Sequence, residues 1–447
     1  MKSNLSIAAA LVVIASVLII DRDLKLWQQE ERIIEYDARI YYGYLPAWFI
    51  FDDLALEKSD YEYDQGKFWF WAVNTSKGKK VFKTTCGVAL MQAPFFLIAH
   101  QVAQWYDYPV TGFSEPYKIF MVIGCAFYLF VGLIFLRMIL LQCGFSDKVT
   151  ALTLLTIGLS TNLIYYTTSV PLMSHAFSFA LIAGFAYTTL RWVEQREMFF
   201  LAMTAIQFGL ITLLRLSNAV VLLFFIIYAF RSVESLRKPR GWIMPALFLT
   251  LGTILAWIPQ ILYWKKAAGE FFVYTYSGEG FFWLDPKIKQ VLIGFRRGWL
   301  IYTPVMIFSL TGLFLMRGAM ASLRNAVVAV LLINLYVISS WWCWWYGGCF
   351  GQRAMVDSYA LLAIPLAATV RYVMSRNVLV RFSGLLVGLF MTWLNIFQSY
   401  QYEHGGLHHD AMSSKAWIRQ FGRLDPVPDA HKYLVYPDYE AALKGDR

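Results

Sequence analysis

Apolar segments of about 16 to 22 residues recur along this chain from Leu5 to Gln398, separated by short polar stretches. Each segment is long enough, or nearly so, to cross the hydrocarbon core of a bilayer. With 58% hydrophobic residues, the chain carries more apolar surface than a soluble domain can bury. Helices satisfy their own backbone hydrogen bonds in lipid. The sequence therefore predicts an all-α polytopic membrane protein.

The positions of the basic residues predict the orientation. They gather in alternate short connections, which hold Lys2, Arg137 and Lys148, Arg191 and Arg196, Arg231 to Arg240, Arg317 and Arg324, and Arg371 to Arg381. Cytoplasmic loops carry such an excess of lysine and arginine. We therefore expect a cytoplasmic N-terminus. The net charge of +10 reflects this topology, and we expect no nucleic-acid partner.

We expect about eleven crossings, namely residues 5–20, 117–136, 149–168, 175–191, 198–214, 218–230, 242–263, 300–316, 325–342, 355–370 and 382–398. The apolar segment 86–104 is left out because counting it would place every later basic loop outside. We interpret it as embedded at the outer interface or re-entrant. Residues 1–398 then form a transmembrane domain with external loops over 21–85 and 264–300, and residues 399–447 form an external tail.

The loop 21–85 holds twelve of the 29 acidic residues and two aromatic clusters, at 36–51 and 68–71. Aromatic rings prefer the membrane interface, so we expect both clusters to form helices lying along it. Within the loop, Asp37 is a candidate general base for an incoming hydroxyl, with Arg39 in reach to orient it. The alternative is an exposed carboxylate that is simply paired with Arg39.

Two further residues on the outer side are candidates for chemistry. His175 begins a later crossing and could meet Asp37 as a hydrogen-bond partner or metal ligand, although a capped helix-start histidine is the alternative. Arg215 lies between two apolar runs, where an ionisable side chain indicates a functional site unless it reaches the interface. Several lysines and arginines are expected on the outer side. They predict contacts to an anionic lipid head group, and ordinary attraction to anionic lipid is the alternative. These residues are Lys79, Lys80, Lys83, Lys265, Lys266, Arg296 and Arg297.

The stretch 341–353 combines four tryptophans with glycines and ends in Gln352 and Arg353. Sugars stack on such aromatic faces, although tryptophans at an interface also form a plain aromatic belt. In the tail, His404, His408, His409 and Asp410 could form a metal cluster, but we interpret them as part of a solvated loop. The five cysteines show no metal-type spacing, and we interpret them as packing residues.

In their order and external placement, these motifs resemble the GT-C superfamily of polyprenyl-phosphate-sugar-dependent glycosyltransferases. Within it, they resemble the bacterial relatives of protein O-mannosyltransferases and the lipid A aminoarabinose transferase. The resemblance spans nearly the whole chain and rests on residues 35–39, Lys83 with Gly87 and Pro94, residues 174–176, 296–304 and 347–353, and Asp357.

The resemblance implies an inverting transfer of a sugar from a polyprenyl-phosphate donor to a lipid, glycan or protein hydroxyl at the periplasmic face. It implies Asp37 as catalytic base, with His175 beside it, and donor-phosphate contacts from Lys83, Arg215, Arg296 and Arg297. We expect further substrate contacts from Arg39, Tyr42, Trp345, Gln352, Arg353 and Asp357. His175 falls where some relatives place a second acidic residue that helps to bind a metal, so a divalent metal at Asp37 and His175 stays open.

Two other classes of protein compete with this interpretation. A polyprenyl-lipid transporter or flippase should show ionisable residues or broken helices near the midplane, and often repeated halves, and neither is evident. A structural subunit of an envelope assembly would account for the aromatic loops. It would not account for the outward arginines.

Overall fold

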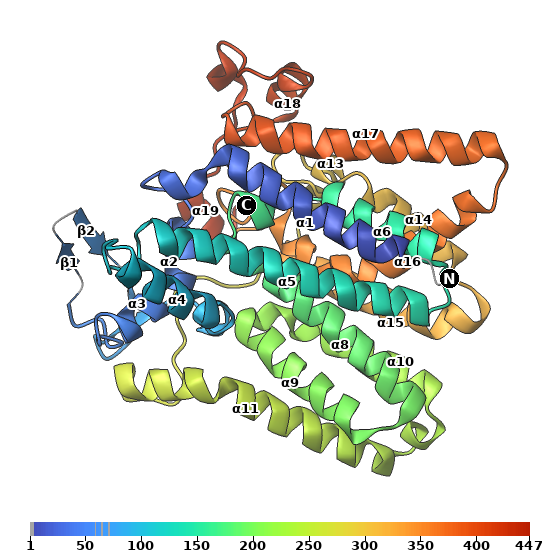
Figure 1. Ribbon diagram of the computed structural model, residues 1–447, viewed down its shortest axis with the longest axis horizontal. Coiled ribbons are helices and arrows are strands. Elements are labelled where there is room, and N and C mark those ends of the chain that lie inside the picture. The colour runs from blue at the N-terminus through green and yellow to red at the C-terminus, as the bar shows by residue number, and fades with distance from the viewer. Residues whose placement is uncertain (1–3, 59, 64–65, 70–71) are drawn as a thin grey trace.

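The computed structural model describes residues 4–58, 60–63, 66–69 and 72–447. These residues are mostly helical and include seven helical segments long and apolar enough to cross a membrane (Figure 1). The helices of these segments are α1 Leu5–Leu24, α5 Glu115–Gln142, α8 His175–Gln195, α11 Ile243–Ala268, α15 Ala321–Ser340, α16 Tyr359–Met374 and α17 Val378–Glu403. Four shorter helices join the bundle, namely α6 Asp147–Leu159, α9 Met198–Leu214, α10 Leu222–Ser232 and α14 Met306–Leu315.

The bundle has a closed centre and open edges. Helices α8 and α16 are its most enclosed members. Helices α11 and α17 form opposite edges in Figure 1, and only 11% of the residues in their most apolar stretches are buried. Their exposed residues are apolar, which suits helices that face lipid. Small residues allow the closest helix contacts: a Cβ added at Gly312 of α14 would lie 1.8 Å from the carbonyl oxygen of Pro365 in α16.

The first loop contains both helices and strands. Residues 36–49 are helical, as expected, and form α2 Tyr36–Tyr42 and α3 Tyr44–Phe49. The helix expected at 68–71 is wrong for Phe68 and Trp69, which lie in a strand paired with Tyr61 and Asp60, and Phe70 and Trp71 lie outside the described residues. Aromatic residues favour extended backbone as readily as an interface. The antiparallel hairpins pair β1 Asp60–Tyr63 with β2 Gly66–Trp69, and β3 Ala72–Asn74 with β4 Lys80–Phe82.

Three expected crossings are broken helices. The segment 149–168 ends its helix at Leu159 and resumes as α7 Tyr165–Thr168, because Asn162 turns its side chain to the hydroxyl of Tyr359 at 2.7 Å. The segment 300–316 is divided into α13 Trp299–Tyr302 and α14 by Pro304, which has no N–H to donate. The segment 218–230 starts as a 3₁₀ turn, η2 Leu216–Val221.

The remaining short elements lie in the connections. Residues 86–104 correspond to α4 Gly87–Trp105, which is not among the seven long apolar segments. The loop 264–300 contains α12 Ile288–Ile293. The other 3₁₀ turns are η1 Leu26–Gln28, η3 Glu234–Arg237, η4 Pro239–Trp242, η5 Gly318–Met320 and η6 Arg353–Ser358.

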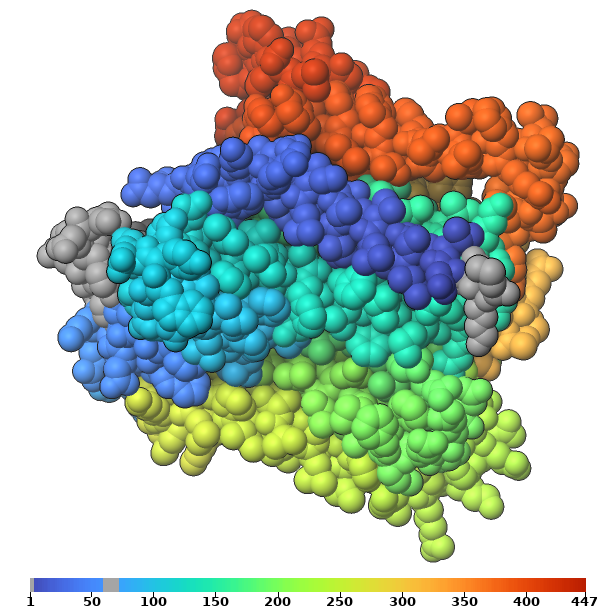
Figure 2. Space-filling model, in the orientation of Figure 1, coloured from blue at the N-terminus to red at the C-terminus, as the bar shows by residue number. Residues whose placement is uncertain are grey.

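The tail after α17 is folded and projects from the bundle (Figure 2). It comprises α18 Ser414–Gln420, η7 Ala430–Tyr433 and α19 Tyr439–Leu443. Arg32 of the first loop donates to Glu403 at 2.7 Å, and Arg447 donates to the carbonyl oxygen of Trp341 at 2.7 Å. The tail is thereby tied to the end of the bundle that carries the first loop.

Candidate functional site

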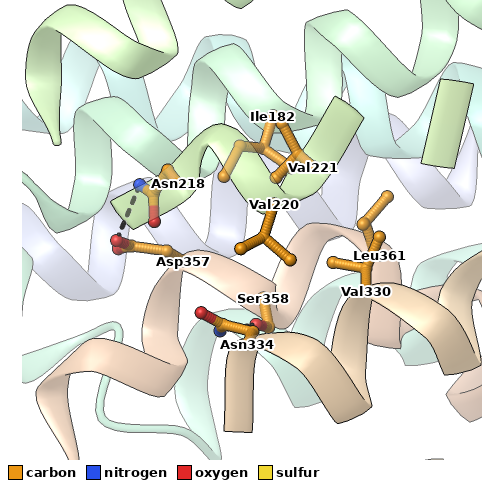
Figure 3. Close-up of a pocket in the computed structure, with 9 residues that line it drawn as sticks. All are labelled: Ile182, Asn218, Val220, Val221, Val330, Asn334, Asp357, Ser358 and Leu361. Carbon is orange, nitrogen blue, oxygen red and sulfur yellow. Dashed lines mark hydrogen bonds between the residues drawn. The ribbon is translucent and has the colours of Figure 1, made fainter. Parts of the chain in front are cut away.

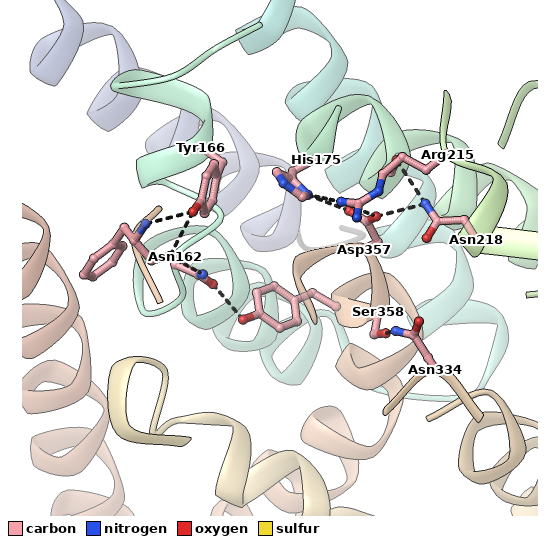
Figure 4. A network of polar contacts seen from close by, with 11 residues as sticks. Asn162, Tyr166, His175, Arg215, Asn218, Asn334, Asp357 and Ser358 are labelled. Carbon is pink, nitrogen blue, oxygen red and sulfur yellow. Dashed lines mark hydrogen bonds and ion pairs between the residues drawn. The ribbon is translucent and has the colours of Figure 1, made fainter. Parts of the chain in front are cut away.

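Three polar residues from distant parts of the sequence meet at one end of the bundle (Figure 4). His175 is the first residue of α8, Arg215 follows the last residue of α9, and Asp357 lies in η6 just before α16. Because α8 and α16 start at this end and α9 finishes there, the chain direction alone brings the three together. Helix α2, with Asp37, lies at the same end, since Asp37 contacts Arg353 of η6.

Asp357 is the buried centre of this group, with 2% of its side chain exposed. Its Oδ1 lies 2.9 Å from His175 Nδ1, and its Oδ2 accepts a hydrogen bond of 2.9 Å from Asn218 Nδ2. Arg215 Nη1 lies 3.5 Å from the same Oδ2. Both carboxylate oxygens are therefore engaged, and buried charges persist when paired in this way. Asp357 can therefore hold Arg215 and His175 in place.

The space behind Asp357 is small (Figure 3). A cavity of about 10 Å³ is lined by Asn218, Asp357, Asn334 and Ser358 together with aliphatic side chains. Asn334 Nδ2 donates to Ser358 Oγ at 2.8 Å. A volume of this size accommodates about one water molecule. A sugar does not fit into this cavity.

Asp37 forms the exposed part of the site. Its Oδ2 accepts a hydrogen bond of 2.9 Å from Arg353 Nη2, and 45% of its side chain is exposed against 16% for Arg353. The guanidinium groups of Arg353 and Arg215 each lie 5.9 Å from the ring centroid of Tyr346, within cation–π range. A continuous row of contacts thus leads from Asp37 through Arg353, Tyr346 and Arg215 to Asp357.

The backbone at Tyr346 places its ring between the two arginines. Tyr346 and Gly347 both have positive φ, at 58° and 66°. This left-handed region suits Gly347 but is strained for tyrosine. Strain of this kind persists only where the surroundings fix the conformation.

The tyrosines around Asp37 remain protonated. Burial raises the pKa of the Tyr346 phenol to about 12, and burial also raises the pKa of Tyr41 and of Tyr276 above its ordinary value. Protonated phenols can donate hydrogen bonds but cannot take up a proton. Of the three carboxylates Asp37, Asp357 and Glu279, Asp37 is the most exposed. It is the one placed to accept a proton from an incoming group.

Lys83 borders this site. It forms an ion pair with Glu279, and its Nζ lies 5.2 Å from the ring centroid of Tyr276. Trp342 Nε1 donates to the other oxygen of Glu279 at 3.0 Å. Tyr276 is in turn close enough to Asp37 and Arg215 to feel their charges. Lys83 therefore supplies a third cation on the approach to Asp37.

Two expectations about Asp37 are corrected. Arg39 does not orient it, because residues two apart on a helix face different sides, and Arg39 Nε instead donates to the carbonyl oxygen of Ile34 at 3.4 Å. Within the described residues, His175 makes no contact with Asp37, because its Nδ1 is directed at Asp357. Among those same residues, neither belongs to a group of three or more close metal-ligating side chains.

Five other expected site residues lie away from Asp37 or are enclosed. Tyr42 is buried against Phe96 and Phe113, and Trp345 and Gln352 are also buried. Arg297 is fully buried beneath the tail, where Nη2 is 3.4 Å from the carbonyl oxygen of His408, and Arg296 Nη2 donates to the carbonyl oxygen of Val435 at 2.8 Å. The two arginines therefore pack against the tail, which the sequence does not predict.

Sequence reasoning missed four contributors to the site, namely Asn218, Tyr276, Glu279 and Tyr346. Asn218 had a usable signal, because it follows Arg215 by three residues in an otherwise apolar stretch. Tyr346 was marked by the glycine pair that follows it. Glu279 and Tyr276 lie in a long loop with no local pattern that predicts their contact with Lys83.

Comparison with known proteins gives matches in structure only. No family model and no curated protein sequence matches the chain. One similar solved structure is the archaeal oligosaccharyltransferase AglB from Archaeoglobus fulgidus in complex with an inhibitory peptide and a dolichol-phosphate, at 13% identity and a TM-score of 0.51. The fold of this chain is similar to that of this oligosaccharyltransferase. The apo form of the Archaeoglobus fulgidus oligosaccharyltransferase matches at 11% identity and a TM-score of 0.50.

The matches cover a larger share of this chain than of the archaeal chains. They cover 97% and 99% of this chain but 59% and 60% of the archaeal chains. The likeness therefore concerns nearly all of the helical bundle described here, and the archaeal proteins are considerably longer.

Proposed function

We propose that this protein is a membrane glycosyltransferase that transfers a sugar from a polyprenyl-phosphate-linked donor to an acceptor hydroxyl with inversion. The observation that carries the proposal is the half-exposed carboxylate of Asp37. Arg353 holds this carboxylate, and Arg215 lies beyond it in the row of contacts through Tyr346. The GT-C-like fold supports it, because the archaeal relative of that fold was solved with a dolichol-phosphate.

In the proposed reaction, Asp37 accepts the proton of the acceptor hydroxyl. The acceptor oxygen attacks the anomeric carbon of the donor sugar, and the bond from that carbon to the phosphate oxygen breaks. The polyprenyl phosphate leaves with the bonding electron pair. A general base of this kind typically contributes roughly 10²- to 10⁴-fold in rate. Asp37 suits the role because Arg353 fixes one oxygen, Oδ2, while nearly half of the side chain is open.

The leaving phosphate needs cations more than it needs a proton donor. Arg353 and Arg215 can contact its oxygens with two N–H groups each, and Lys83 adds a point charge. In the described structure each of these cations is paired with a carboxylate, namely Asp37, Asp357 or Glu279. We propose that Asp357 and His175 position Arg215 from behind without touching substrate.

The proposed orientation places this site outside the cytoplasm. Together with α6 and the three shorter apolar helices, the seven long segments would make eleven crossings. The basic connections with Arg137, Arg191, Arg237 and Arg371 then share the end opposite Asp37, as the positive-inside rule requires. We propose a bacterial inner membrane, a periplasmic site and tail, and a lipid, glycan or protein hydroxyl as acceptor.

Mass spectrometry of cellular lipid extracts tests the proposal. Cells that express wild type, Asp37→Asn or the control Asp23→Asn are compared at equal membrane levels of protein. The control removes the same charge as Asp37→Asn. Among the described residues, Asp23 pairs only with its neighbour Arg22 at the end of α1. We expect a polyprenyl-phosphate-linked sugar to accumulate with Asp37→Asn alone, and its mass would identify the sugar. Identical extracts from cells that make the donor would overturn the role of Asp37.

A further inference from the structure

We propose that the C-terminal tail contains a zinc-type transition-metal site formed by His408, His409 and Asp410. It lies apart from Asp37 and does not depend on the proposed reaction. The expectation of a solvated loop fails for two of these residues, since Asp410 is buried and His408 is partly buried, while His409 is exposed. The ligand atoms of the three side chains all lie within 4.8 Å of one another.

Two of the three separations between the ligand atoms match a tetrahedral metal. Asp410 Oδ1 lies 3.3 Å from His408 Nδ1 and 3.5 Å from His409 Nε2. Zinc binds histidine nitrogen and carboxylate oxygen at about 2.0–2.2 Å, which sets neighbouring ligands about 3.3–3.5 Å apart in a tetrahedron. Both measured separations therefore correspond to edges of such a tetrahedron.

Asp410 Oδ1 itself points to a cation. The side chain of Asp410 is nine-tenths buried, and Oδ1 accepts no hydrogen bond from the described residues. A buried carboxylate oxygen without a hydrogen bond is costly unless a cation lies close to it. The lone pair of His408 Nδ1 points to the backbone N–H groups of Asp410 at 3.3 Å and Ala411 at 3.2 Å, and His408 would exchange these contacts for the ion when the metal binds.

The surroundings of Asp410 resemble the outer support of a metal site. Its second oxygen, Oδ2, accepts a hydrogen bond of 2.9 Å from the hydroxyl of Tyr439 in α19. Hydrogen bonds of this kind orient ligands and raise metal affinity. Two imidazoles with one carboxylate favour Zn²⁺ and its neighbours in the transition series over Mg²⁺ or Ca²⁺, which prefer oxygen ligands.

The proposed metal would fasten the tail to the loop that supports Tyr346. The backbone N–H of Cys349 donates to the carbonyl oxygen of His409 at 3.3 Å, and Tyr439 packs against Trp345 with ring centroids 5.5 Å apart. The loop 341–353 is thus in contact with the tail on both sides of Tyr346. An ion bound by His408, His409 and Asp410 would hold this contact closed.

Isothermal titration with ZnCl₂ tests the site on the full chain in detergent, without a histidine tag and after treatment with chelator. We expect one equivalent of zinc for wild type, and at least tenfold weaker binding for His409→Ala and for Asp410→Asn. The control His404→Ala removes a nearby exposed histidine that stacks on Tyr400, and it should bind zinc as wild type does. MgCl₂ should give no saturable binding.

Hydrogen exchange provides a second measurement that does not rely on the variants alone. Zinc should slow exchange in residues 404–412 and 343–353 of wild type and leave Asp410→Asn unchanged. No zinc binding by wild type, or equal binding by the His409→Ala and Asp410→Asn proteins, would overturn the proposal. Asp37→Asn should bind zinc normally, so failure of the metal site and failure of the proposed transferase remain distinguishable.

Discussion

The residue that holds Asp37 is Arg353, which is 316 positions away in the sequence. The local sequence favours Arg39, which lies two residues from Asp37. The structure shows that this proximity is misleading, because α2 directs the two side chains to different sides. Candidate acids and cations can thus be read from residue type and position, whereas their pairing depends on packing between α2 and η6 that the sequence alone does not reveal.

Substitution of each arginine by glutamine separates these two partners. In Arg353→Gln, Asp37 loses its hydrogen-bonded cation, and we expect sugar transfer to fall by roughly 10²-fold because the base is no longer fixed. Arg39→Gln should retain most activity, since Arg39 contacts the backbone at Ile34. Transfer rates in membranes with matched protein levels measure the difference.

A double variant shows whether Arg353 acts through Asp37. Residues in direct contact give non-additive effects, so Arg353→Gln should cost less in the Asp37→Asn background than in wild type, and the loss that remains there measures the contact of Arg353 with the leaving phosphate. Fully additive losses, or a larger loss for Arg39→Gln than for Arg353→Gln, would contradict the proposed pairing.

Helices α14 and α16 show what packing adds at the scale of an element. The apolar lengths predict that both segments are helical, but they do not predict that α14 starts only after Pro304 or that its Gly312 touches the backbone of α16. Close backbone approach at small residues is a feature of helix contacts in membranes. It depends on which faces meet, and hydropathy does not contain this information.

Gly312→Ala is expected to destabilise the bundle. A Cβ at this position would lie 1.8 Å from the carbonyl oxygen of Pro365, so the two helices must move apart. Overpacking of this kind costs about 1–3 kcal/mol. Thermal unfolding in detergent should show a lower midpoint, and sugar transfer should fall with it because η6, which carries Arg353 and Asp357, leads directly into α16.

Gly388→Ala in α17 is the matched control. A Cβ there meets no atom within 4 Å, and alanine is the better helix former by about 0.5–1 kcal/mol. Its unfolding midpoint should equal or exceed that of wild type. A midpoint for Gly312→Ala as high as that of Gly388→Ala would mean that the contact between α14 and α16 is looser than the structure shows.

At the scale of the whole molecule, composition and charge pattern predicted a polytopic helical protein, and the seven long apolar segments agree with it. The candidates Asp37, Arg215, Arg353 and Asp357 were all assigned to one side of the membrane, and the structure brings them together through the pairs Arg353–Asp37 and Arg215–Asp357. The folded tail was not predicted, because its contacts involve short polar motifs that resemble any surface loop.

The side of the membrane on which the N-terminus lies decides on which side this end lies, and the number of crossings decides whether the tail shares it. Cysteines introduced at Lys415 in the tail and at Arg237 in a basic connection provide the test, and four of the five native cysteines are buried. With eleven crossings, a membrane-impermeant maleimide should label Lys415→Cys in intact cells and label Arg237→Cys only after the membrane is opened. Labelling of both in intact cells would show that the bundle is not inserted as proposed. Labelling of Arg237→Cys alone would place Asp37 in the cytoplasm, where basic loops are favoured and a periplasmic acceptor could not reach it.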